Sequence, residues 1–390
     1  MRQGTLGWNP TPRLAPAEAH PYLPPMPTLV ATGVHAPSAV ITNDELVESY
    51  NAHAALWNAQ NAEAIATGAL APKAPSSAAF ILQASGIERR KVVEKSGVLD
   101  PARMRPRLPA RSPDEPSLMA EMGVAAAQIA LARAATDPAD LDLVVCAASN
   151  MERAYPALGV EIQALLGAPG FAFDMNVACS SATFAIAAVA DMIRAGTIAR
   201  ALIVNPEITS GHLEWRDRDC HFIFGDVATA IVMAADGPGY RVRSTRMATR
   251  FSNNIRNDDG FLRRSRDQMD DRREMQFRQE GRKVFKEVLP LVVDHVEAHM
   301  AAEGVQPADL KRLWLHQANK AMNDYVGRRV LGRDPAPGEQ PNVLQDYANT
   351  SSAGSIIALD HHWDLAPGSL GLLCSFGAGY SVGSAILERL

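Results

Sequence analysis

Cys179 is the residue of this sequence best placed to act as a nucleophile. It stands where a short apolar run ends, at Met175, and a run of small residues with helical character begins, at Ser180. A thiol beside the first turn of a helix lies near backbone N–H groups, whose partial positive charge favours the thiolate. Since the thiolate is the form that attacks a carbonyl carbon, the position suits covalent catalysis. The alternative is a buried structural cysteine, a common fate of a lone cysteine.

Two other polar residues stand at similar junctions. His316 ends an apolar stretch in Trp314-Leu315-His316-Gln317, and Asn349 precedes the run of small residues that starts at Ser351. A thiol, an imidazole and an amide that meet in one crevice suit acyl transfer. The cysteine would take up an acyl group, and the other two side chains would donate hydrogen bonds to a carbonyl oxygen as its negative charge grows. A lone histidine at the end of a strand is more often structural, but the combination of three favours catalysis.

The segments that position these residues belong to a pattern that occurs twice. Pro138-Ala139-Asp140-Leu141 and Pro307-Ala308-Asp309-Leu310 each follow a helical pattern, lead into an apolar strand and are followed by an asparagine at the same offset from the proline. A second repeat sets Ser180-Ser181-Ala182 against Ser351-Ser352-Ala353, each at the start of an apolar helix. Each half closes with an apolar strand that begins at a glycine, over residues 225–232 and 379–387.

Two similar halves predict a duplicated α/β body. Strands that alternate with helices indicate mostly parallel sheets covered by helices, with the chemistry in the crevice where strand ends meet helix starts. We expect an N-terminal extension over residues 1–27, a first half over 28–239 and a second half over 240–390. Residues 51–79, rich in alanine and proline, are typical of an inserted surface excursion. The charge-dense residues 240–282 are typical of a solvated loop followed by the exposed face of a helix.

Composition excludes several classes of protein. With 390 residues, 47% of them hydrophobic, and a formal net charge of −5, the chain lacks the basic excess of a nucleic-acid binder. The four cysteines form neither a disulfide framework nor a CxxC metal motif, which fits a reducing compartment. The apolar stretches are shorter than a membrane span, and a secretory signal pattern is absent. We therefore expect a soluble, cytoplasmic protein.

The three motifs together carry a resemblance to a known family. Ala178-Cys179-Ser180, His316-Gln317-Ala318-Asn319 and Asn349-Thr350-Ser351 resemble the Cys-His-Asn triad of the β-ketoacyl-acyl-carrier-protein synthase III family, in the thiolase superfamily. The likeness runs from about residue 28 to the C-terminus. It implies a duplicated, five-layered αβαβα fold and a homodimer. It also implies that a primer acyl-CoA acylates the cysteine and that malonyl-acyl carrier protein is then decarboxylated and condensed, without any cofactor.

The resemblance also implies roles for residues around the triad. Ser375-Phe376-Gly377-Ala378-Gly379 resembles the glycine-rich turn that lends a backbone N–H to the oxyanion hole, so Ala378 and Cys179 would form that hole. The other residues that match substrate-binding positions are Tyr155, Arg218, Phe224, Phe285, Asn319 and Phe376. Among these, Tyr155 would reach the acyl pocket of a partner subunit and Arg218 would lie near the entrance for the CoA nucleotide. Three lysines would form a basic patch for the carrier protein: Lys283, Lys286 and Lys320.

This chain also departs from the family pattern. Phe80 and Ala84 stand where the family often has a tryptophan and an arginine that sandwich the CoA adenine, so one aromatic face is kept and a cation is lost. Ala321 replaces an arginine that often docks the carrier protein. CoA or another carrier can therefore be the primer donor. Some longer relatives with extended N-terminal segments accept medium-chain primers, which makes a medium acyl chain our expectation.

Other reactions of the superfamily fit less well. Thiolases need a second cysteine in the C-terminal glycine-rich turn, where this chain has Ser375, with Cys374 one residue away. Non-decarboxylative condensing enzymes use a glutamate base before a proline that corresponds to Pro156, and here Tyr155 takes that place, with Glu152 close by. A pure acyltransferase and a non-catalytic homologue that binds acyl chains or carrier protein are the remaining alternatives. Because both His316 and Asn349 are present as donors, we favour decarboxylative condensation.

Overall fold

The structure is a computed structural model that describes residues 25–265 and 272–390. Most of the predicted N-terminal extension, residues 1–24, lies outside the described residues, as does the part of the charge-dense segment over 266–271. None of the described helices combines the length and the apolar composition that a membrane span requires.

Nine of the described strands form one large sheet in which the same order of four strands occurs twice, and the other four form two small two-stranded sheets. The first half contains β1 (Thr28–His35), β4 (Leu143–Ala147), β5 (Phe171–Met175), β6 (Arg200–Glu207) and β7 (Val227–Ala234). The second half contains β8 (Tyr240–Ser252), β11 (Leu310–Leu315), β12 (Leu370–Gly377) and β13 (Gly379–Arg389). The order is β1-β7-β6-β4-β5 in one half and β8-β13-β12-β11 in the other, and pairing of β1 with β8 joins them. The predicted division after residue 239 falls in the turn between β7 and β8.

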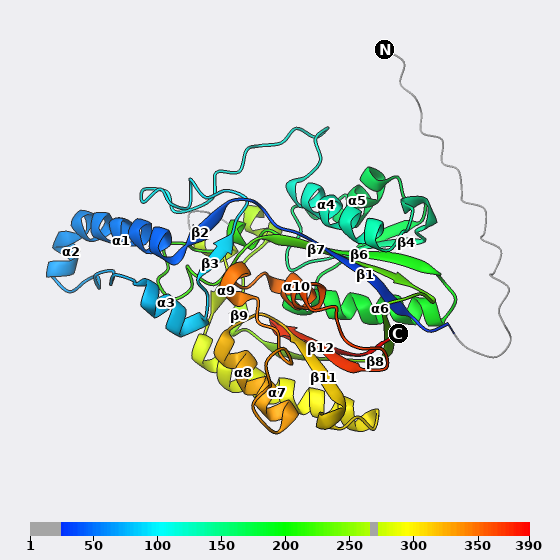
Figure 1. The fold of residues 1–390 in the computed structure, drawn as a ribbon. Helices are drawn as coiled ribbons and strands as arrows, with labels where there is room; N and C mark the ends of the chain where they lie inside the picture. The colour runs from blue at the N-terminus through cyan, green and yellow to red at the C-terminus, as the bar shows by residue number, and fades with distance from the viewer. Residues whose placement is uncertain (1–24, 266–271) are drawn as a thin grey trace, which may run out of the picture.

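Helices and strands alternate in five layers (Figure 1). Helices cover the outer face of each layer of strands and also lie between the two layers of strands. One outer layer contains α4 (Leu118–Arg133) and α5 (Leu158–Leu166), and the opposite one contains α7 (Gly281–Ala302) and α8 (Lys320–Leu331). The central layer contains α6 (Ser181–Arg194) and α10 (Gly354–His361). Both helices are covered by strands on two sides, which explains why α6 is rich in alanine and why Ala182, Ala185 and Ala190 are fully buried.

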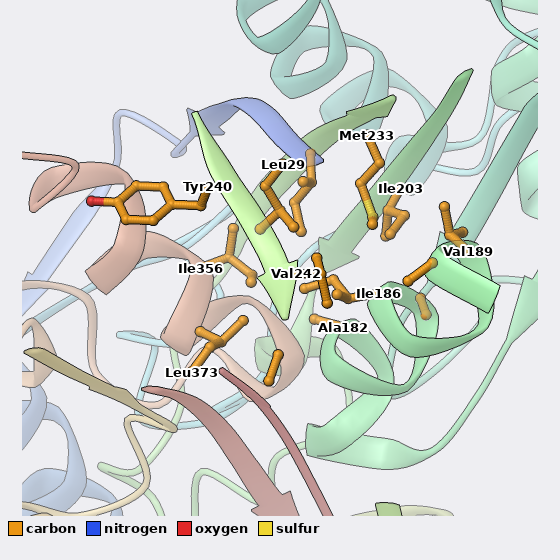
Figure 2. Close-up of a cluster of buried hydrophobic side chains, with 14 of the residues drawn as sticks. Leu29, Ala182, Ile186, Val189, Ile203, Met233, Tyr240, Val242, Ile356 and Leu373 are labelled. Carbon is orange, nitrogen blue, oxygen red and sulfur yellow. The ribbon is translucent and has the colours of Figure 1, made fainter. Parts of the chain in front are cut away.

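The main hydrophobic core fills the space around the central helices (Figure 2). Ala182, Ile186 and Val189 of α6 face side chains of β1, β6, β7 and β8, and Ile356 of α10 lies near Leu373 of β12. The core therefore fixes the starts of α6 and α10 relative to the strand ends of both halves. These helix starts carry the residues predicted to be catalytic.

The remaining elements lie mostly at one end of the sheet and, apart from the 18-residue α1, are short. They are α1 (Asn43–Gln60), α2 (Ala62–Ala66), α3 (Ala78–Ser85), α9 (Leu344–Tyr347), β2 (Val40–Thr42), β3 (Arg89–Lys91), β9 (Ile255–Arg256) and β10 (Arg278–Gln279). The two small sheets pair β2 with β3 and β9 with β10. The 3-10 turns are η1 (Pro138–Asp140), η2 (Ala178–Ser180), η3 (Thr209–Gly211), η4 (Phe261–Ser265), η5 (Arg272–Met275), η6 (Pro307–Asp309) and η7 (Ser351–Ala353). The repeated Pro-Ala-Asp-Leu motif forms η1 and η6, at equivalent points before β4 and β11.

The segment over residues 51–79 begins inside α1 and is tied back to it. Thr42 caps this helix in a capping box with Glu45. After α2 the chain returns along α1, where the side-chain amide of Asn51 exchanges two hydrogen bonds with the backbone of Ser76, and that of Asn58 does the same with Lys73. The segment is therefore a helical arm with a clamped return loop, projecting from the body at the left of Figure 1.

The prediction of mostly parallel sheets is wrong. Within the sheet of described strands, β4 with β5, β4 with β6 and β11 with β12 are parallel, and the other five neighbouring pairs are antiparallel. One reason is that β7 and β13 follow β6 and β12 without an intervening α-helix, and each pairs antiparallel with the strand before it. The apolar composition of these strands gives no information on their direction.

The interpretation of residues 240–282 as a loop and helix face is also wrong over its first part. Residues 240–252 form β8, the longest strand, which pairs with β13 over the range from Ser252 opposite Gly379 to Tyr240 opposite Arg389. Its charged side chains lie mostly on exposed or half-buried positions, because β8 beyond Val242 has little covering on its outer face. Backbone pairing, which charge density does not reveal, decides the conformation here.

Candidate active site

Ser351 brings the three predicted catalytic residues together. Its hydroxyl donates to Sγ of Cys179 at 3.4 Å, and its backbone N–H donates to Oδ1 of Asn349 at 2.8 Å. Its backbone also lies beside the imidazole of His316 and acts to raise the pKa of that ring. The triad predicted from three distant segments therefore meets at one serine of η7, on the boundary between the two halves. The sequence analysis quoted Ser351 as part of a motif and gave it no role.

The backbone around Cys179 and Ser351 has the same unusual geometry in both halves. Ala178 and Ser351 have positive φ angles of 48° and 50°. In each case the backbone N–H of the positive-φ residue is bonded by the side chain of an asparagine two residues earlier, Asn176 or Asn349. Such conformations cost about 1–3 kcal/mol and persist where the surroundings hold them. The two turns are thus equivalent, and they present Cys179 and Ser352 at matching positions.

This equivalence corrects the register of the serine repeat. The sequence pairs Ser180-Ser181-Ala182 with Ser351-Ser352-Ala353, whereas the matching turns pair Ala178 with Ser351. The sequence register is therefore wrong by two residues. Runs of serine and alanine are too uniform to fix a register, and the positive φ angle that does fix it is invisible in the sequence.

Burial dominates the acidity of Cys179. It raises the pKa of the thiol to about 11, and hydrogen bonds from the Ser351 hydroxyl and from the backbone N–H groups of Ala378 and Cys179 act in the opposite direction. The expectation that the helix start favours the thiolate is therefore wrong for the resting protein, because desolvation of the charged form outweighs the donors. The thiol is protonated near neutral pH and must lose its proton during acyl transfer.

The glycine-rich turn between β12 and β13 packs directly on the thiol. A Cβ atom at Gly377 would lie 2.7 Å from Cβ and 2.9 Å from Sγ of Cys179, so only glycine fits there. The next residue, Ala378, directs its backbone N–H toward the sulfur. The N–H groups predicted for an oxyanion hole, those of Cys179 and Ala378, thus both point at the reacting atom.

His316 is a neutral, dry imidazole. It is 2% exposed, and burial lowers its pKa to about 4, while the nearby backbone of Ser351 acts in the opposite direction. The ring of Phe376 meets it edge-on at a centroid distance of 5.3 Å. A neutral imidazole stabilises a developing oxyanion as a hydrogen-bond donor and not as a cation. Phe376 therefore packs against a catalytic candidate, and its contact with substrate stays a prediction.

Hydrogen bonds of its backbone and of its side-chain oxygen hold Asn349 in place. Its N–H donates to the carbonyl of Ile223 and its carbonyl accepts from Gly225, which forms a bridge to Phe224. Because Oδ1 accepts from Ser351, the side-chain NH₂ group is directed away, and it makes no hydrogen bond within the described residues. It can therefore donate to a substrate carbonyl. Phe224 is buried beside it and packs edge-on against Phe277 at 4.7 Å.

Glu207 is a functional candidate that the sequence analysis missed. It ends β6, is 1% exposed, and accepts hydrogen bonds from the N–H and hydroxyl of Ser149 at 2.9 and 2.6 Å. It accepts two more from the N–H and hydroxyl of Ser352, at 3.2 and 2.5 Å. Burial raises the pKa of this carboxyl to about 7, against the lowering effect of the serines. The signal in the sequence is a glutamate that directly follows the uncharged residues 201–206 of a strand, a residue type that is almost never buried without partners.

The predicted substrate-binding residues lie around this centre at different distances from solvent. Asn319 caps α8 and donates to the carbonyl of Ala84 at 2.6 Å, which ties α3 to the strand that carries His316. The guanidinium of Arg218 lies 4.1 Å from the ring centre of Phe80, so these two side chains stack directly on each other. Phe285 is 42% exposed near the start of α7, and Tyr155 is 84% exposed in this single chain.

The predicted carrier-protein lysines lie on the surface of α7 and α8. Lys283, in the first turn of α7, pairs with Glu280 at the N-cap of that helix, and Lys320 pairs with Asp324 one turn along α8. Lys286 is also exposed, on α7. Exposed pairs of this kind are weak and can exchange partners, so they neither support nor exclude a docking role.

Two family models match the chain in the region of the site. The model described as 3-oxoacyl-[acyl-carrier-protein] synthase III matches residues 173–250, and the model of its C-terminal region matches residues 300–389. The first match includes Cys179, and the second includes His316 and Asn349.

Curated relatives match over most of the chain. A "Beta-ketodecanoyl-[acyl-carrier-protein] synthase" of Pseudomonas aeruginosa is 53% identical over 349 residues, which cover 88% of this chain and 100% of that protein. A "Beta-ketoacyl-[acyl-carrier-protein] synthase III" of Acidiphilium cryptum is 35% identical over 272 residues, which cover 68% of this chain and 83% of that protein.

Solved structures confirm the predicted fold class. The 3-oxoacyl-[acyl-carrier-protein] synthase III of Aquifex aeolicus superposes with a TM-score of 0.74 at 23% identity, over 93% of this chain and 100% of that one. The priming β-ketosynthase of the R1128 polyketide pathway superposes with a TM-score of 0.75 at 24% identity, over 94% and 97%. The duplicated five-layered αβαβα arrangement is therefore the fold of this chain.

Proposed function

Since the chain belongs to the β-ketoacyl-acyl-carrier-protein synthase III family, we propose that Cys179 is its acyl-accepting nucleophile and that His316 and Asn349 promote the condensation. As a member of that family the chain is an acyl-transferring condensing enzyme. The observation that carries the assignment of roles is the junction at Ser351, where the thiol, the imidazole and the amide share one residue.

The first half-reaction loads the enzyme. Sγ of Cys179 attacks the thioester carbonyl of an acyl-CoA, the backbone N–H groups of Cys179 and Ala378 receive the oxyanion, and the CoA thiolate leaves and takes up the proton that the cysteine lost. The acyl chain is then held as a thioester on Cys179. Phe224, beside Asn349 and buried against Phe277, supplies an apolar surface for that chain.

The second half-reaction forms the carbon–carbon bond. Malonyl-acyl carrier protein loses CO₂, and the electron pair of the broken bond becomes an enolate whose oxygen accepts hydrogen bonds from His316 and Asn349. The enolate carbon attacks the acyl thioester, and 3-oxoacyl-carrier protein forms as the Cys179 thiolate leaves and is reprotonated. A neutral His316, with its pKa lowered to about 4 by burial, suits the donor role over the whole neutral range.

The alternative of a non-decarboxylative reaction, with Glu152 as the base, receives no support. The carboxylate of Glu152 accepts a hydrogen bond from the backbone N–H of Met119, in the first turn of α4, at 3.0 Å. This contact uses the carboxylate to cap the first turn of α4, which is a structural role.

The primer that we propose is an eight-carbon acyl group. The relative from Pseudomonas aeruginosa is named as a β-ketodecanoyl-carrier protein synthase. A decanoyl product contains ten carbons, of which malonyl contributes two after loss of CO₂, so the primer contributes eight. This matches the medium chain expected from the sequence, and the CoA thioester is the form we propose for it.

We also propose a cytoplasmic homodimer that docks the carrier protein through Lys283, Lys286 and Lys320. Support for the dimer comes from β5, an edge strand of the sheet that exposes 47% of Phe171, and from the exposed ring of Tyr155. An edge strand with apolar side chains is a surface that proteins normally cover.

The test is a condensation assay with acyl-CoAs of increasing chain length, malonyl-acyl carrier protein and mass detection of the product. We expect 3-oxodecanoyl-carrier protein from octanoyl-CoA to form with the highest kcat/KM. Activity that is greatest with acetyl-CoA would refute the proposed primer, and the absence of any product from all chain lengths would refute the proposed reaction.

A further inference from the structure

A pocket of about 390 Å³ lies between β3, α9 and the end of α10. None of the three residues proposed to be catalytic lines it, and the proposed function gives it no role. The strand contributes two cations, α9 an acid and a phenol, and the end of α10 two imidazoles: Arg89, Lys91, Asp346, Tyr347, His361 and His362. The sequence analysis assigned no role to these side chains.

The alternation of side chains along β3 places its two outer cations on one face. Successive side chains of a strand point to opposite sides, so Arg89 and Lys91 share a face and Arg90 lies on the other. Arg90 is fully buried and donates to Oδ1 of Asn43 at 2.7 Å. The cations that line the pocket therefore lie on a strand that is fixed from its opposite side.

The charges of the pocket do not cancel. Nε of Arg89 donates to Oδ1 of Asp346 at 2.7 Å, so these two charges offset each other. The half-buried ammonium of Lys91 makes neither an ion pair nor a hydrogen bond within the described residues, and its charge is unopposed. A partly desolvated cation without a counter-charge is stabilised when an anion binds beside it.

The same pocket offers further hydrogen-bond donors. Arg89 uses Nε on Asp346, and its two terminal NH₂ groups have no hydrogen-bond partner in the part of the chain that the structure describes. The imidazole of His361 lies beside Tyr347, with 3.5 Å between Nε2 and the phenol oxygen. A phosphate group carries about −1.5 to −2 charges near pH 7 and three strong acceptor oxygens, so it can accept from several of these donors at once.

The volume of the pocket indicates a ligand larger than phosphate alone. A water molecule takes up about 30 Å³ of liquid volume, so a phosphate group, with five heavy atoms, fills part of the cavity. Val40 and Val343 supply apolar surface beside the charged groups. The cavity also falls in the range of about 300–1,000 Å³ that is typical of sites for small organic ligands. A phosphate group attached to a small organic group therefore matches both the charge and the volume.

The wall formed by α9 leads to two residues of the predicted triad. Tyr347, which lines the pocket, precedes Asn349 by two residues. The backbone N–H of Val343 donates to Oε1 of Gln317, the neighbour of His316, at 3.0 Å. A ligand in the pocket would therefore lie against the segment that holds the proposed donors of the condensation step.

We propose that this pocket binds a phosphate monoester of a small organic molecule, with Lys91 and the terminal NH₂ groups of Arg89 on its phosphate. Asp346 keeps the guanidinium in place from the other side. The site goes beyond the proposed function, because neither acyl-CoA nor the carrier protein is assigned to it. Ligand and substrates can therefore be bound at the same time.

The test is calorimetric titration of the full chain with phenyl phosphate, at constant ionic strength because salt screens exposed charges. Lys91→Gln removes the unopposed charge, and we expect it to raise the Kd about tenfold, the loss of one charge-assisted contact. The variant should unfold at the same denaturant concentration as the wild type, since this side chain has no partner to lose. Lys311→Gln is the matched control, because Lys311 is an exposed lysine outside the pocket that donates to the carbonyl of Ala308, and it should bind the probe as the wild type does.

Inorganic phosphate is the second probe, because it offers the same oxygens without an organic group. We expect it to bind more weakly than phenyl phosphate and to lose affinity in Lys91→Gln by a similar factor. Equal affinity for the two probes would overturn the assignment of an organic monoester. No binding of phenyl phosphate to the wild type, or equal Kd values for the wild type and Lys91→Gln, would overturn the site itself.

Discussion

Reactivity at Cys179 depends on donors that surround a protonated thiol. Burial raises the pKa of the thiol to about 11, and the hydroxyl of Ser351 and the N–H of Ala378 already point at the sulfur. The N–H group of Ala378, together with that of Cys179, is also the donor that we propose for the oxygen of a tetrahedral intermediate. At the scale of single residues, the site is arranged for the charge that forms during reaction and not for the charge of the free enzyme.

Substitution of His316 or Asn349 separates the two half-reactions. We expect His316→Ala and Asn349→Ala to form the acyl-enzyme and to lower the rate of malonyl decarboxylation by about 10²–10³-fold, because each removes one donor to the enolate oxygen. The measurement is CO₂ release from malonyl-carrier protein after loading with octanoyl-CoA. Either variant condensing at the wild-type rate would contradict the assigned role.

At the scale of elements, helix starts and strand turns from both halves determine where Cys179, His316 and Asn349 meet. The two equivalent turns, which contain Ala178 and Ser351 at positive φ, lie immediately before α6 and α10. They direct the starts of both helices toward the same point. The turn between β12 and β13 then closes over the sulfur, and the end of β6 supports η7 through Glu207. These contacts join segments of both halves, so each half alone lacks a complete site.

The closing turn should tolerate no side chain at Gly377. We expect Gly377→Ala to reduce acylation by about 100-fold, because the added methyl would overlap Cys179 and displace the sulfur from its donors. The rate of acyl-enzyme formation measures the effect. Gly260→Ala is the control, since a Cβ there meets no atom within 4 Å, and it should acylate as the wild type does.

The hydrogen bonds that hold η7 in place should depend on the carboxylate of Glu207. Glu207→Gln places an NH₂ group against serine donors, so we expect a loss of about 1–3 kcal/mol in the free energy of unfolding and a 10- to 100-fold drop in kcat. Denaturant unfolding and the condensation assay measure the two effects. Glu339→Gln, which breaks an exposed pair with Arg333, should change neither by much. A fully active Glu207→Gln enzyme would show that the network is dispensable.

At the scale of the molecule, duplication made much of the fold predictable. The Pro-Ala-Asp-Leu repeat correctly indicated two halves with the same strand order, and the three segments of the predicted triad lie together in the structure, while their catalytic roles remain predictions. Strand direction, the register of the serine repeat and the conformation of β8 were predicted wrongly, because pairing and backbone angles decide them. Ser351 and Glu207 were missed since their importance arises only where the two halves touch.

The buried histidines make the whole molecule sensitive to acid. Burial lowers the pKa of His221 to about 3 and those of His212, His295, His299 and His316 to about 4. Between pH 4 and 6.5 the unfolded chain therefore binds more protons than the folded one, so stability rises with pH in this window and is lost as pH falls. The raised pKa values of Glu207, about 7, and Asp226, about 6, act in the opposite direction and involve fewer groups.

We therefore expect the free energy of unfolding to decrease steadily from pH 6.5 to 4, with a slope of about 1.4 kcal/mol per pH unit for each net proton taken up. Denaturant titrations at several pH values measure this slope. Stability that is constant or increasing as pH falls through this window would show that the buried histidines do not govern the response.

The most direct test of the account is the mass of the intact protein after incubation with an octanoyl thioester, given as octanoyl-CoA and as octanoyl-carrier protein. The account predicts one octanoyl group per chain on the wild type and none on Cys179→Ala, which keeps the buried thiols of Cys146, Cys220 and Cys374. An adduct that persists in Cys179→Ala, or no adduct on the wild type from either donor, would contradict the assignment of Cys179 as the nucleophile.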